Sequence, residues 1–113
     1  MVILTISANA RSNKRNEFLS ACRLITDQTR QEKDCLGCRL SQDIDNENLI
    51  NIEETWEHRS SLDEYFRSDI FSALLGAVKL LGETHEIRIN DGSLTEGMEA
   101  VQAARSKEGD SKQ

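Results

Sequence analysis

Residues 37–81 read GCRLSQDIDNENLINIEETWEHRSSLDEYFRSDIFSALLGAVKLL, and the order of patterns in this stretch decides the fold. Two β-type runs, 35–42 and 49–57, are separated by a polar cluster rich in turn-forming residues. They predict an antiparallel hairpin. Apolar residues at helical spacing then predict a helix up to Leu81, with a second cap or a kink at Ser68-Asp69.

The segments on either side complete a simple order of elements. Residues 2–8 alternate between apolar and polar types, which predicts a first strand. Residues 14–31 carry an apolar stripe typical of an amphipathic helix, and residues 85–90 alternate again. The order strand, helix, strand, strand, helix, strand is that of the ferredoxin-like α+β fold. Its sheet is antiparallel and both helices lie on one face.

A length of 113 residues corresponds to one domain. We expect residues 1–92 to form the ferredoxin-like domain, 93–105 a C-terminal helical extension, and the polar residues 106–113 a disordered tail. The apolar share of 37% and the aromatic share of 4% are low for a self-sufficient core. We therefore expect the open face of the sheet to pack against a second copy, which closes a dimeric α/β barrel.

Charge and hydropathy exclude two classes of partner. Twenty acidic against fourteen basic residues give a net charge of −6, which repels a phosphate backbone, so nucleic acid is not expected. No run approaches the ~20 apolar residues that span a bilayer, so no membrane partner is expected. The first residues lack the basic region of a signal peptide. A cytoplasmic location is the expectation.

Cys22, Cys35 and Cys38 are predicted to be free thiols, because an odd count without an export signal argues against a disulfide framework. Cys35 and Cys38 match CxxC, but a structural zinc site needs about four ligands and the sequence holds no second pair. The pair opens a strand, so we expect its side chains to point to different neighbours. No metal site is predicted, and the role of the pair stays open.

Three residues near the end of the third strand and in the following helix are candidates for chemistry. Tyr65 can exchange a proton with an aromatic substrate or stack on it, or it can simply pack at the domain edge. Trp56 can line a ligand cavity or anchor the core. Glu54 shares a strand face with Trp56 and is expected to be partly buried. A structural ion pair with Arg39 or Arg88 across the sheet is favoured for Glu54 over a role as general base.

Asn9 lies with Ser7 and Thr5 on the face of the first strand that points away from its apolar set. If the apolar set meets the helices, these groups face the barrel between subunits. There the Asn9 amide can orient a ligand carbonyl or a dioxygen species, or it can make an ordinary strand-end hydrogen bond. The sequence carries no phosphate-binding loop, nucleophile elbow, dinucleotide fingerprint or HExxH, so no cofactor is predicted.

Over residues 2–90 the chain resembles the antibiotic biosynthesis monooxygenase family of dimeric α/β barrels. The residues that carry the similarity are Gly37-Cys38-Arg39-Leu40, Asp45, the run from Ile52 to Glu57 with its Glu-x-Trp, and Leu62, Tyr65, Ser68 and Phe71. The resemblance implies cofactor-free oxygenation of quinol-like or polyketide aromatics in some members. In others it implies haem degradation or isomerisation of a small phosphorylated signal.

One difference from the family pattern excludes one of these activities. Many members carry a histidine in the second helix where this chain has Tyr65. A haem-degrading member is also expected to carry a histidine about ten residues later, where Leu74 and Leu75 stand here. Haem degradation is therefore not expected.

The resemblance implies a homodimeric, cofactor-independent monooxygenase of a small electron-rich aromatic such as a hydroquinone. Tyr65 and Asn9 are the candidate catalytic residues, and the candidate substrate-binding residues are Trp56, Phe71, Glu54 and Arg39. One alternative is a non-catalytic, small-ligand-binding or stress-related dimer on the same fold. Another is an isomerase of a small polar metabolite.

Overall fold

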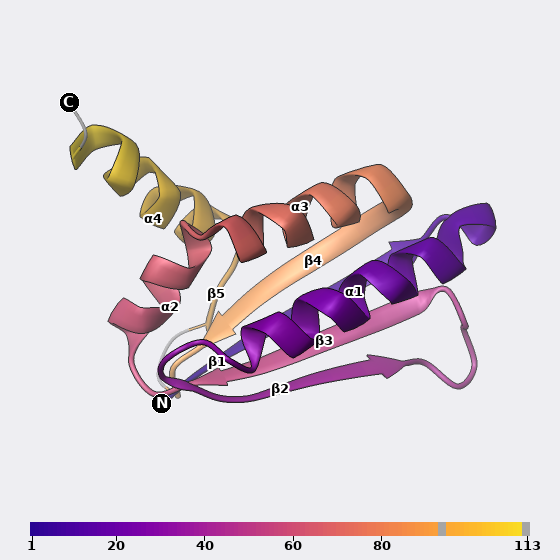
Figure 1. Cartoon of the computed structure of the whole chain (residues 1–113), viewed down its shortest axis with the longest axis horizontal. Coiled ribbons are helices and arrows are strands. Elements are labelled where there is room, and N and C mark those ends of the chain that lie inside the picture. Colours follow the sequence, from indigo (N-terminus) through magenta and orange to yellow (C-terminus); the bar gives the residue numbers. More distant parts are fainter. Residues whose placement is uncertain (93–94, 112–113) are drawn as a thin grey trace.

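The computed structural model has its first four strands and the helices between them in the order that the sequence predicts (Figure 1). The structure describes residues 1–92 and 95–111, with side chains as far as Lys107. The elements are β1 (Val2–Ala10), the 3-10 turn η1 (Ser12–Lys14), α1 (Arg15–Thr29), β2 (Cys35–Gln42), β3 (Leu49–Trp56), α2 (Arg59–Phe66), α3 (Asp69–Leu81), β4 (Gly82–Asn90), β5 (Thr95–Glu96) and α4 (Met98–Ser111). The ferredoxin-like α+β fold is confirmed. Within the described residues, no helix is long and apolar enough to cross a membrane.

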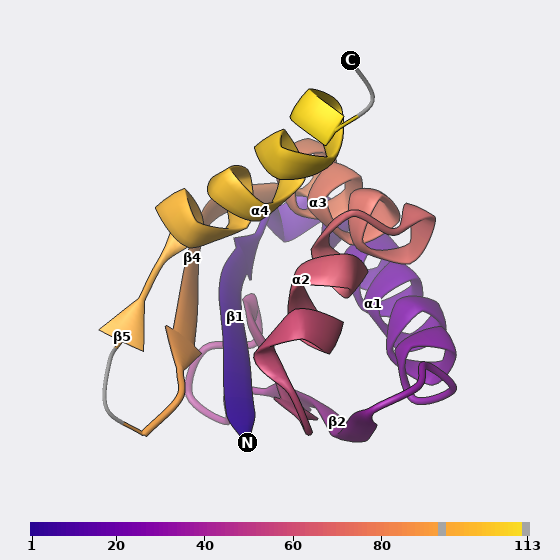
Figure 2. The ribbon, with the colours of Figure 1, turned by 90° about the vertical axis from the view of Figure 1, so that its left-hand side faces the viewer.

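The strands form one antiparallel sheet in the order β2-β3-β1-β4-β5. Across its centre Leu4 of β1 lies between Glu54 of β3 and Ile89 of β4, and each of the three is at most 1% exposed. Figures 1 and 2 show α1 and α3 lying along this face, with α2 at one end of the sheet. The core therefore lies between the sheet and the helices.

The opposite face of the sheet is polar. Thr5 lies between Glu53 and Arg88 in the strand register, and the Ser7 hydroxyl donates a 2.6 Å hydrogen bond to Asn51 Oδ1. In the part of the chain that the structure describes, no helix covers this face (Figure 2). Packing of this face against a second copy stays a prediction.

A bulge in β2 changes the geometry expected for the CxxC pair. Cys35 pairs with Trp56 and Cys38 with Glu54, with a register shift between them at Leu36. The extra residue restores both cysteines to the helix-covered face, where they pack against the core. The expectation that they point to different neighbours is wrong, because simple alternation leaves out the bulged residue. Both thiols are free, and burial raises the pKa of Cys38 to about 12.

The helical stretch that ends at Leu81 is divided in two at Ser68, as its sequence predicts. The Ser68 hydroxyl donates to the Tyr65 carbonyl at 2.6 Å and accepts from the Phe71 amide at 3.1 Å. It thus closes α2 and caps the start of α3. The break lets α2 leave the direction of α3 and lie across one end of the sheet (Figure 1).

The C-terminal segment adds a short strand and a helix to the ferredoxin-like order. β5 pairs with the end of β4, and α4 packs against α2 and β4. The Arg105 guanidinium donates to the Phe66 carbonyl at the end of α2. α4 continues to Ser111, so the tail expected to be disordered over 106–113 is helical up to that residue, and 112–113 lie outside the described residues.

Candidate functional site

A cavity of about 300 Å³ opens between α2 and the connection from α1 to β2. Its floor is made by the side chains of Trp56 and Tyr65, which are 1% and 3% exposed. Its polar rim consists of Glu32, Lys33, Asp34, Ser60, Ser61, Glu64 and Ser68. This cavity lies within one chain on the helix-covered side, whereas the sequence placed the pocket on the bare sheet face.

Wider hollows lie on the outer side of α1 and between α1 and α3. Their walls are surface side chains such as Leu24 and Gln28, and neither hollow is lined by an aromatic ring. We therefore take the smaller cavity above Trp56 and Tyr65 as the candidate site. It alone among these three combines aromatic surface with a buried titratable group.

Behind the floor, a carboxyl group accepts hydrogen bonds from both aromatic residues. Tyr65 Oη donates to Glu54 Oε2 at 3.0 Å, and Trp56 Nε1 donates to Glu54 Oε1 at 3.1 Å. The Thr29 hydroxyl of α1 lies 3.1 Å from Tyr65 Oη and donates to the Ile25 carbonyl at 2.8 Å. A connected hydrogen-bond network thus runs from the cavity floor into the core.

Glu54 is 1% exposed, and this burial raises the pKa of its carboxyl group to about 7. Removal from water disfavours the charged form, while the hydrogen bonds from Trp56 and Tyr65 act in the opposite direction. The ion pair expected with Arg39 or Arg88 is wrong. Both arginines alternate onto the opposite face of the sheet, where Arg39 faces Glu53 in the register.

Tyr65 is held as a protonated phenol. Burial first, and then the charge of Glu54, raise the pKa of its hydroxyl above the ordinary value of 10.0. Its ring lies 4.7 Å from that of Trp56 between centroids, and Phe71 packs edge-on against it at 5.3 Å. Phe71 supports Tyr65 from the core side and is not among the residues that line the cavity. At neutral pH the Tyr65 hydroxyl is therefore protonated, so it can donate a hydrogen bond or relay a proton but cannot act as a general base in its ionised form.

The rim depends on a tight turn between α1 and β2. Asp34 has a φ of +68°, a left-handed conformation that aspartate tolerates better than most residues. Its carbonyl accepts from the Glu57 amide at 2.8 Å, and its carboxylate accepts from the Ser61 hydroxyl. These bonds connect the α1–β2 turn to the start of α2 and so define two sides of the cavity mouth.

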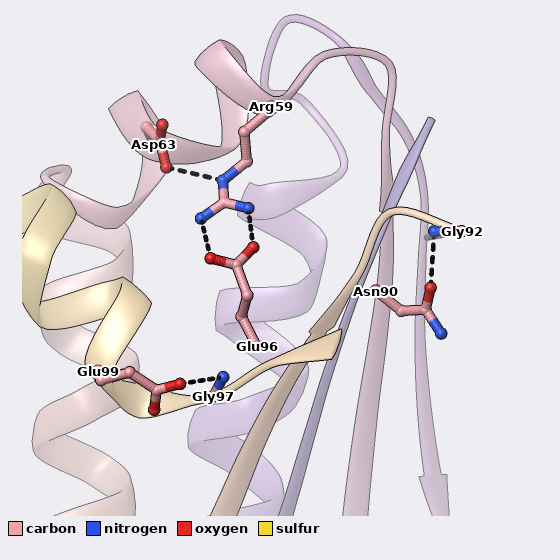
Figure 3. Close-up of polar contacts among 7 residues, drawn as sticks. All are labelled: Arg59, Asp63, Asn90, Gly92, Glu96, Gly97 and Glu99. Carbon is pink, nitrogen blue, oxygen red and sulfur yellow. Dashed lines mark hydrogen bonds and ion pairs between the residues drawn. The ribbon is translucent and has the colours of Figure 1, made fainter. Parts of the chain in front are cut away.

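Residues beyond the cavity hold the first turn of α2 in place. Arg59 donates to Asp63 Oδ1 at 3.1 Å and also binds Glu96 of β5 through both terminal nitrogens (Figure 3). Glu99 accepts from the Gly97 amide at 3.1 Å and closes the turn from β5 into α4 (Figure 3). The C-terminal segment therefore anchors the helix that carries Tyr65.

The structure brings together only part of the set of residues that the sequence singled out. Tyr65, Trp56 and Glu54 form one cluster, with Phe71 behind it. Asn9 lies on the open sheet face, where its amide donates to Thr84 Oγ1 at 3.2 Å. The exposed Arg39 lies on that same face.

Sequence reasoning missed Thr29 and the rim residue Asp34. A signal for Thr29 was present, since it occupies a polar position on the apolar stripe of α1 together with Cys22 and Ile25. A polar residue in such a stripe is either bonded within the helix or directed at a buried polar partner, and Thr29 does both. Asp34 gave no comparable signal, because its role depends on its contact with Ser61.

Fold and site together define a ferredoxin-like α+β protein with an aromatic-floored cavity beneath its second helix. The model of the family described as antibiotic biosynthesis monooxygenase matches residues 1–76, and the chain belongs to this family. Among proteins with curated descriptions, none matches this chain.

Solved structures show the same fold at low sequence identity. A conserved protein from Methanosarcina mazei Go1 is 23% identical with a TM-score of 0.73, covering 79% of this chain and 89% of its own. An antibiotic biosynthesis monooxygenase is 20% identical with a TM-score of 0.75, covering 83% and 100%. A Deinococcus radiodurans protein described as a candidate member of that family is 21% identical with a TM-score of 0.77, covering 83% and 94%. At these identities the likeness establishes the shared fold.

Proposed function

We propose that this protein is a cofactor-independent monooxygenase of a small electron-rich aromatic of the hydroquinone type. One observation carries the proposal: a cavity floored by Trp56 and Tyr65 has a buried carboxyl group, Glu54, bonded directly behind it. An aromatic floor suits a flat substrate, and a phenol next to a carboxyl group suits proton exchange with a substrate hydroxyl. Membership of the family supports a monooxygenase-type reaction.

In this reaction the substrate supplies the electrons. A hydroquinone and one dioxygen give a hydroxyquinone and one water, so one oxygen atom enters the ring and the other leaves reduced. The anion of the substrate reduces dioxygen far more readily than the neutral phenol. The protein therefore has to favour the anion and keep bulk water away from the reacting pair.

The residues divide these tasks. The Tyr65 hydroxyl meets the substrate hydroxyl, and the Trp56 ring forms the wall on which the substrate stacks. The serine hydroxyls of Ser60, Ser61 and Ser68 offer hydrogen bonds to a second polar group on the substrate. Asn9 and Arg39 lie on the other side of the sheet, so any ligand contact they make belongs to a space between two copies.

The charge of the rim disfavours one alternative, an isomerase of a phosphorylated metabolite. Three rim carboxylates, those of Glu32, Asp34 and Glu64, are set against the single cation of Lys33. An acidic mouth repels a phosphate group. A neutral phenol enters it without such a cost.

A second candidate function is binding of a small aromatic without turnover. It is favoured by the engagement of the Tyr65 hydroxyl, which already contacts Glu54 and Thr29 within the protein. The two functions share the same cavity and differ in whether dioxygen is consumed.

Oxygen uptake measured with a panel of hydroquinones tests the enzyme proposal. We expect uptake in proportion to substrate, with little peroxide, and a fall of about a hundredfold in Tyr65→Phe. Thr26→Val is the matched control. Thr26 is a buried threonine of α1 whose hydroxyl acts on the Cys38 thiol and is not among the hydrogen-bond partners of Tyr65 or Glu54 in the described residues. If the folded protein binds a hydroquinone but consumes no more oxygen than buffer, the enzyme proposal is wrong and the binding function is supported.

We also propose that the protein is a homodimer joined through the open sheet face. Members of this family are commonly dimeric, and the face of β1 that carries Thr5 and Ser7 has no helix over it within the described residues. Ile3, 37% exposed on the same face, adds apolar surface there. The catalytic cavity lies on the far side of the sheet, so the proposed chemistry does not depend on the dimer.

A further inference from the structure

The buried end of the hydrogen-bond network has a chemical role that the proposed function leaves open. We propose that Glu54 receives the proton lost by a phenolic ligand, with Tyr65 as the relay between cavity and carboxylate. The inference rests on the proposed function for the class of ligand, a phenol. It adds where the proton goes.

The geometry around Tyr65 Oη fits a relay. A tyrosine hydroxyl has one proton and two acceptor lone pairs. The proton is directed to Glu54 Oε2 at 3.0 Å. The Thr29 hydroxyl, 3.1 Å away, has a single proton, which goes either to the Ile25 carbonyl or to Tyr65 Oη, so it occupies at most one of the two lone pairs. Within the described residues at least one acceptor position of Tyr65 Oη therefore stays open, and Tyr65 lines the cavity.

The transfer balances without any further reactant. The O–H bond of the ligand breaks as Tyr65 Oη takes its proton, and the original O–H bond of Tyr65 breaks as Glu54 Oε2 takes that one. The site begins with a neutral phenol, neutral Tyr65 and ionised Glu54. It ends with a phenolate, neutral Tyr65 and protonated Glu54. One negative charge moves from the core into the cavity, and Tyr65 is never left as an anion.

The groups nearest to Glu54 favour its protonation because burial disfavours the charged carboxylate, whereas the rim carboxylates act against the phenolate in the cavity. Cys35 and Cys38 of β2 approach Glu54 across the strands, and burial raises the pKa of both thiols, so they are neutral at neutral pH. From its own strand and from α2 it receives the Trp56 and Tyr65 hydrogen bonds. Leu4 of β1 contributes no charge.

The charged side chains in this region make no direct hydrogen bond to Glu54 within the described residues. Arg30, just beyond α1, acts on the two β2 thiols and is paired with Asp27, while Glu32 and the other rim carboxylates border the cavity. With burial as the main influence, the pKa of Glu54 stays about 7. A carboxyl group near neutrality can both accept a proton and release it again.

A direct test uses the only tryptophan of the chain. Because the Trp56 indole N–H donates to Glu54, its NMR signal reports the ionisation of that carboxyl group. We expect a single step at about pH 7 in the native protein and no step in Glu54→Gln. Glu53→Gln, which removes the neighbouring exposed carboxylate on the other face, is the matched control and keeps the step. A native protein without a step between acid and alkaline pH overturns the proposal.

The relay itself is tested with 3-nitrophenol, whose colour reports ionisation, at a pH of about 8, where Glu54 is charged. The native protein and Thr26→Val are expected to enrich the bound probe in phenolate. Glu54→Gln and Tyr65→Phe are expected to reduce that enrichment by about tenfold. If Glu54→Gln does not fold, Tyr65→Phe carries the comparison.

The outcomes separate the two proposals. A probe that binds but stays neutral, or that ionises equally in Glu54→Gln or Tyr65→Phe, overturns the relay and leaves the monooxygenase proposal standing. If the probe does not bind to the native protein, the result contradicts both the proposal that the cavity binds aromatic ligands and the proposed relay. Ionisation confined to proteins with both Glu54 and Tyr65 supports the relay even if the oxygen-uptake assay fails.

Discussion

Tyr65 Oη donates a 3.0 Å hydrogen bond to Glu54 Oε2 on the helix-covered side of the sheet, and neither residue is more than 3% exposed. A buried carboxyl group without a cationic hydrogen-bond partner costs stability whenever it is charged. The only side chains shown to donate to it, within the described residues, are the two aromatic rings of the cavity floor. The same pair therefore links the stability of the fold to the chemistry proposed for the site.

The first prediction concerns the dependence of stability on pH. The pKa of Glu54 is about 7 in the folded protein against an ordinary value of 4.5, so the folded state binds the proton more tightly. The resulting stabilisation is fully present below the lower value and is lost as the pH rises through 7. Over that range the native protein should lose about 3 kcal/mol of unfolding free energy relative to Glu54→Gln.

Urea unfolding at either end of this range measures the effect. Glu53→Gln, on the exposed face, should track the native protein within about 0.5 kcal/mol at both pH values. The prediction fails if Glu54→Gln and the native protein show the same change in unfolding free energy between acid and alkaline pH.

Much of the fold could be predicted because it depends on local periodicity. The alternation in β1 and β3 correctly placed Leu4 and Glu54 on the inner face, and Ser68 correctly marked the break before α3. The partner of Glu54 could not be predicted in the same way. The hydrogen-bond donors to Glu54 are Trp56 of its own strand and Tyr65 of α2, and the second contact depends on how α2 lies against the sheet. That placement has no periodic signature.

The cavity was also beyond local reasoning. Its mouth needs the left-handed Asp34, the contact of Asp34 with Ser61, and the short α2 that sets Tyr65 over Trp56. The conformation of Asp34 is not marked by any pattern of residue types, and the other two features are contacts between different elements. The sequence alone therefore identified the aromatic residues of the site but assigned its chemistry to the opposite face, where Asn9 lies.

The second prediction concerns the contact that anchors α2. Glu96→Gln keeps the shape of the side chain but removes the charge that meets Arg59. Both side chains are partly exposed, so the loss of unfolding free energy should be below about 1 kcal/mol and smaller at high salt. Amide hydrogen exchange in the first turn of α2 should speed up, whereas Glu83→Gln on exposed β4 should leave it unchanged. Unaltered exchange in Glu96→Gln would show that α2 is held by its apolar contacts alone.

The third prediction compares two glycines of the α3–β4 region. A Cβ at Gly82 would lie 2.6 Å from the Val78 carbonyl oxygen, a backbone atom that cannot move aside. Gly82→Ala should therefore lower the unfolding free energy by about 1–3 kcal/mol. A Cβ at Gly76, inside α3, meets nothing within 4 Å, so Gly76→Ala should raise it by about 0.5–1 kcal/mol. Equal effects in thermal unfolding would contradict the packing described at the end of α3.

The fourth prediction concerns the proposed dimer. Thr5 lies in the middle of the open sheet face between Glu53 and Arg88, so Thr5→Arg should weaken self-association by at least about tenfold. Ser20→Arg, on the exposed side of α1, should not. Sedimentation of the native protein across the micromolar range provides the baseline. If the native protein is monomeric throughout that range, the proposed dimer is wrong, whereas the cavity within one chain is unaffected.

The two edge strands of the sheet, β2 and β5, differ in length. At one end β2 is bent by its bulge at Leu36, and at the other β5 contributes only the two residues Thr95 and Glu96. The bulge interrupts pairing along β2 and so discourages a foreign strand from adding there. At the other edge β5 covers only Ile89 and Asn90, so within the described residues Gly82 to Arg88 of β4 pair with β1 alone. Extension of the sheet by another strand is therefore favoured along β4 and not along β2.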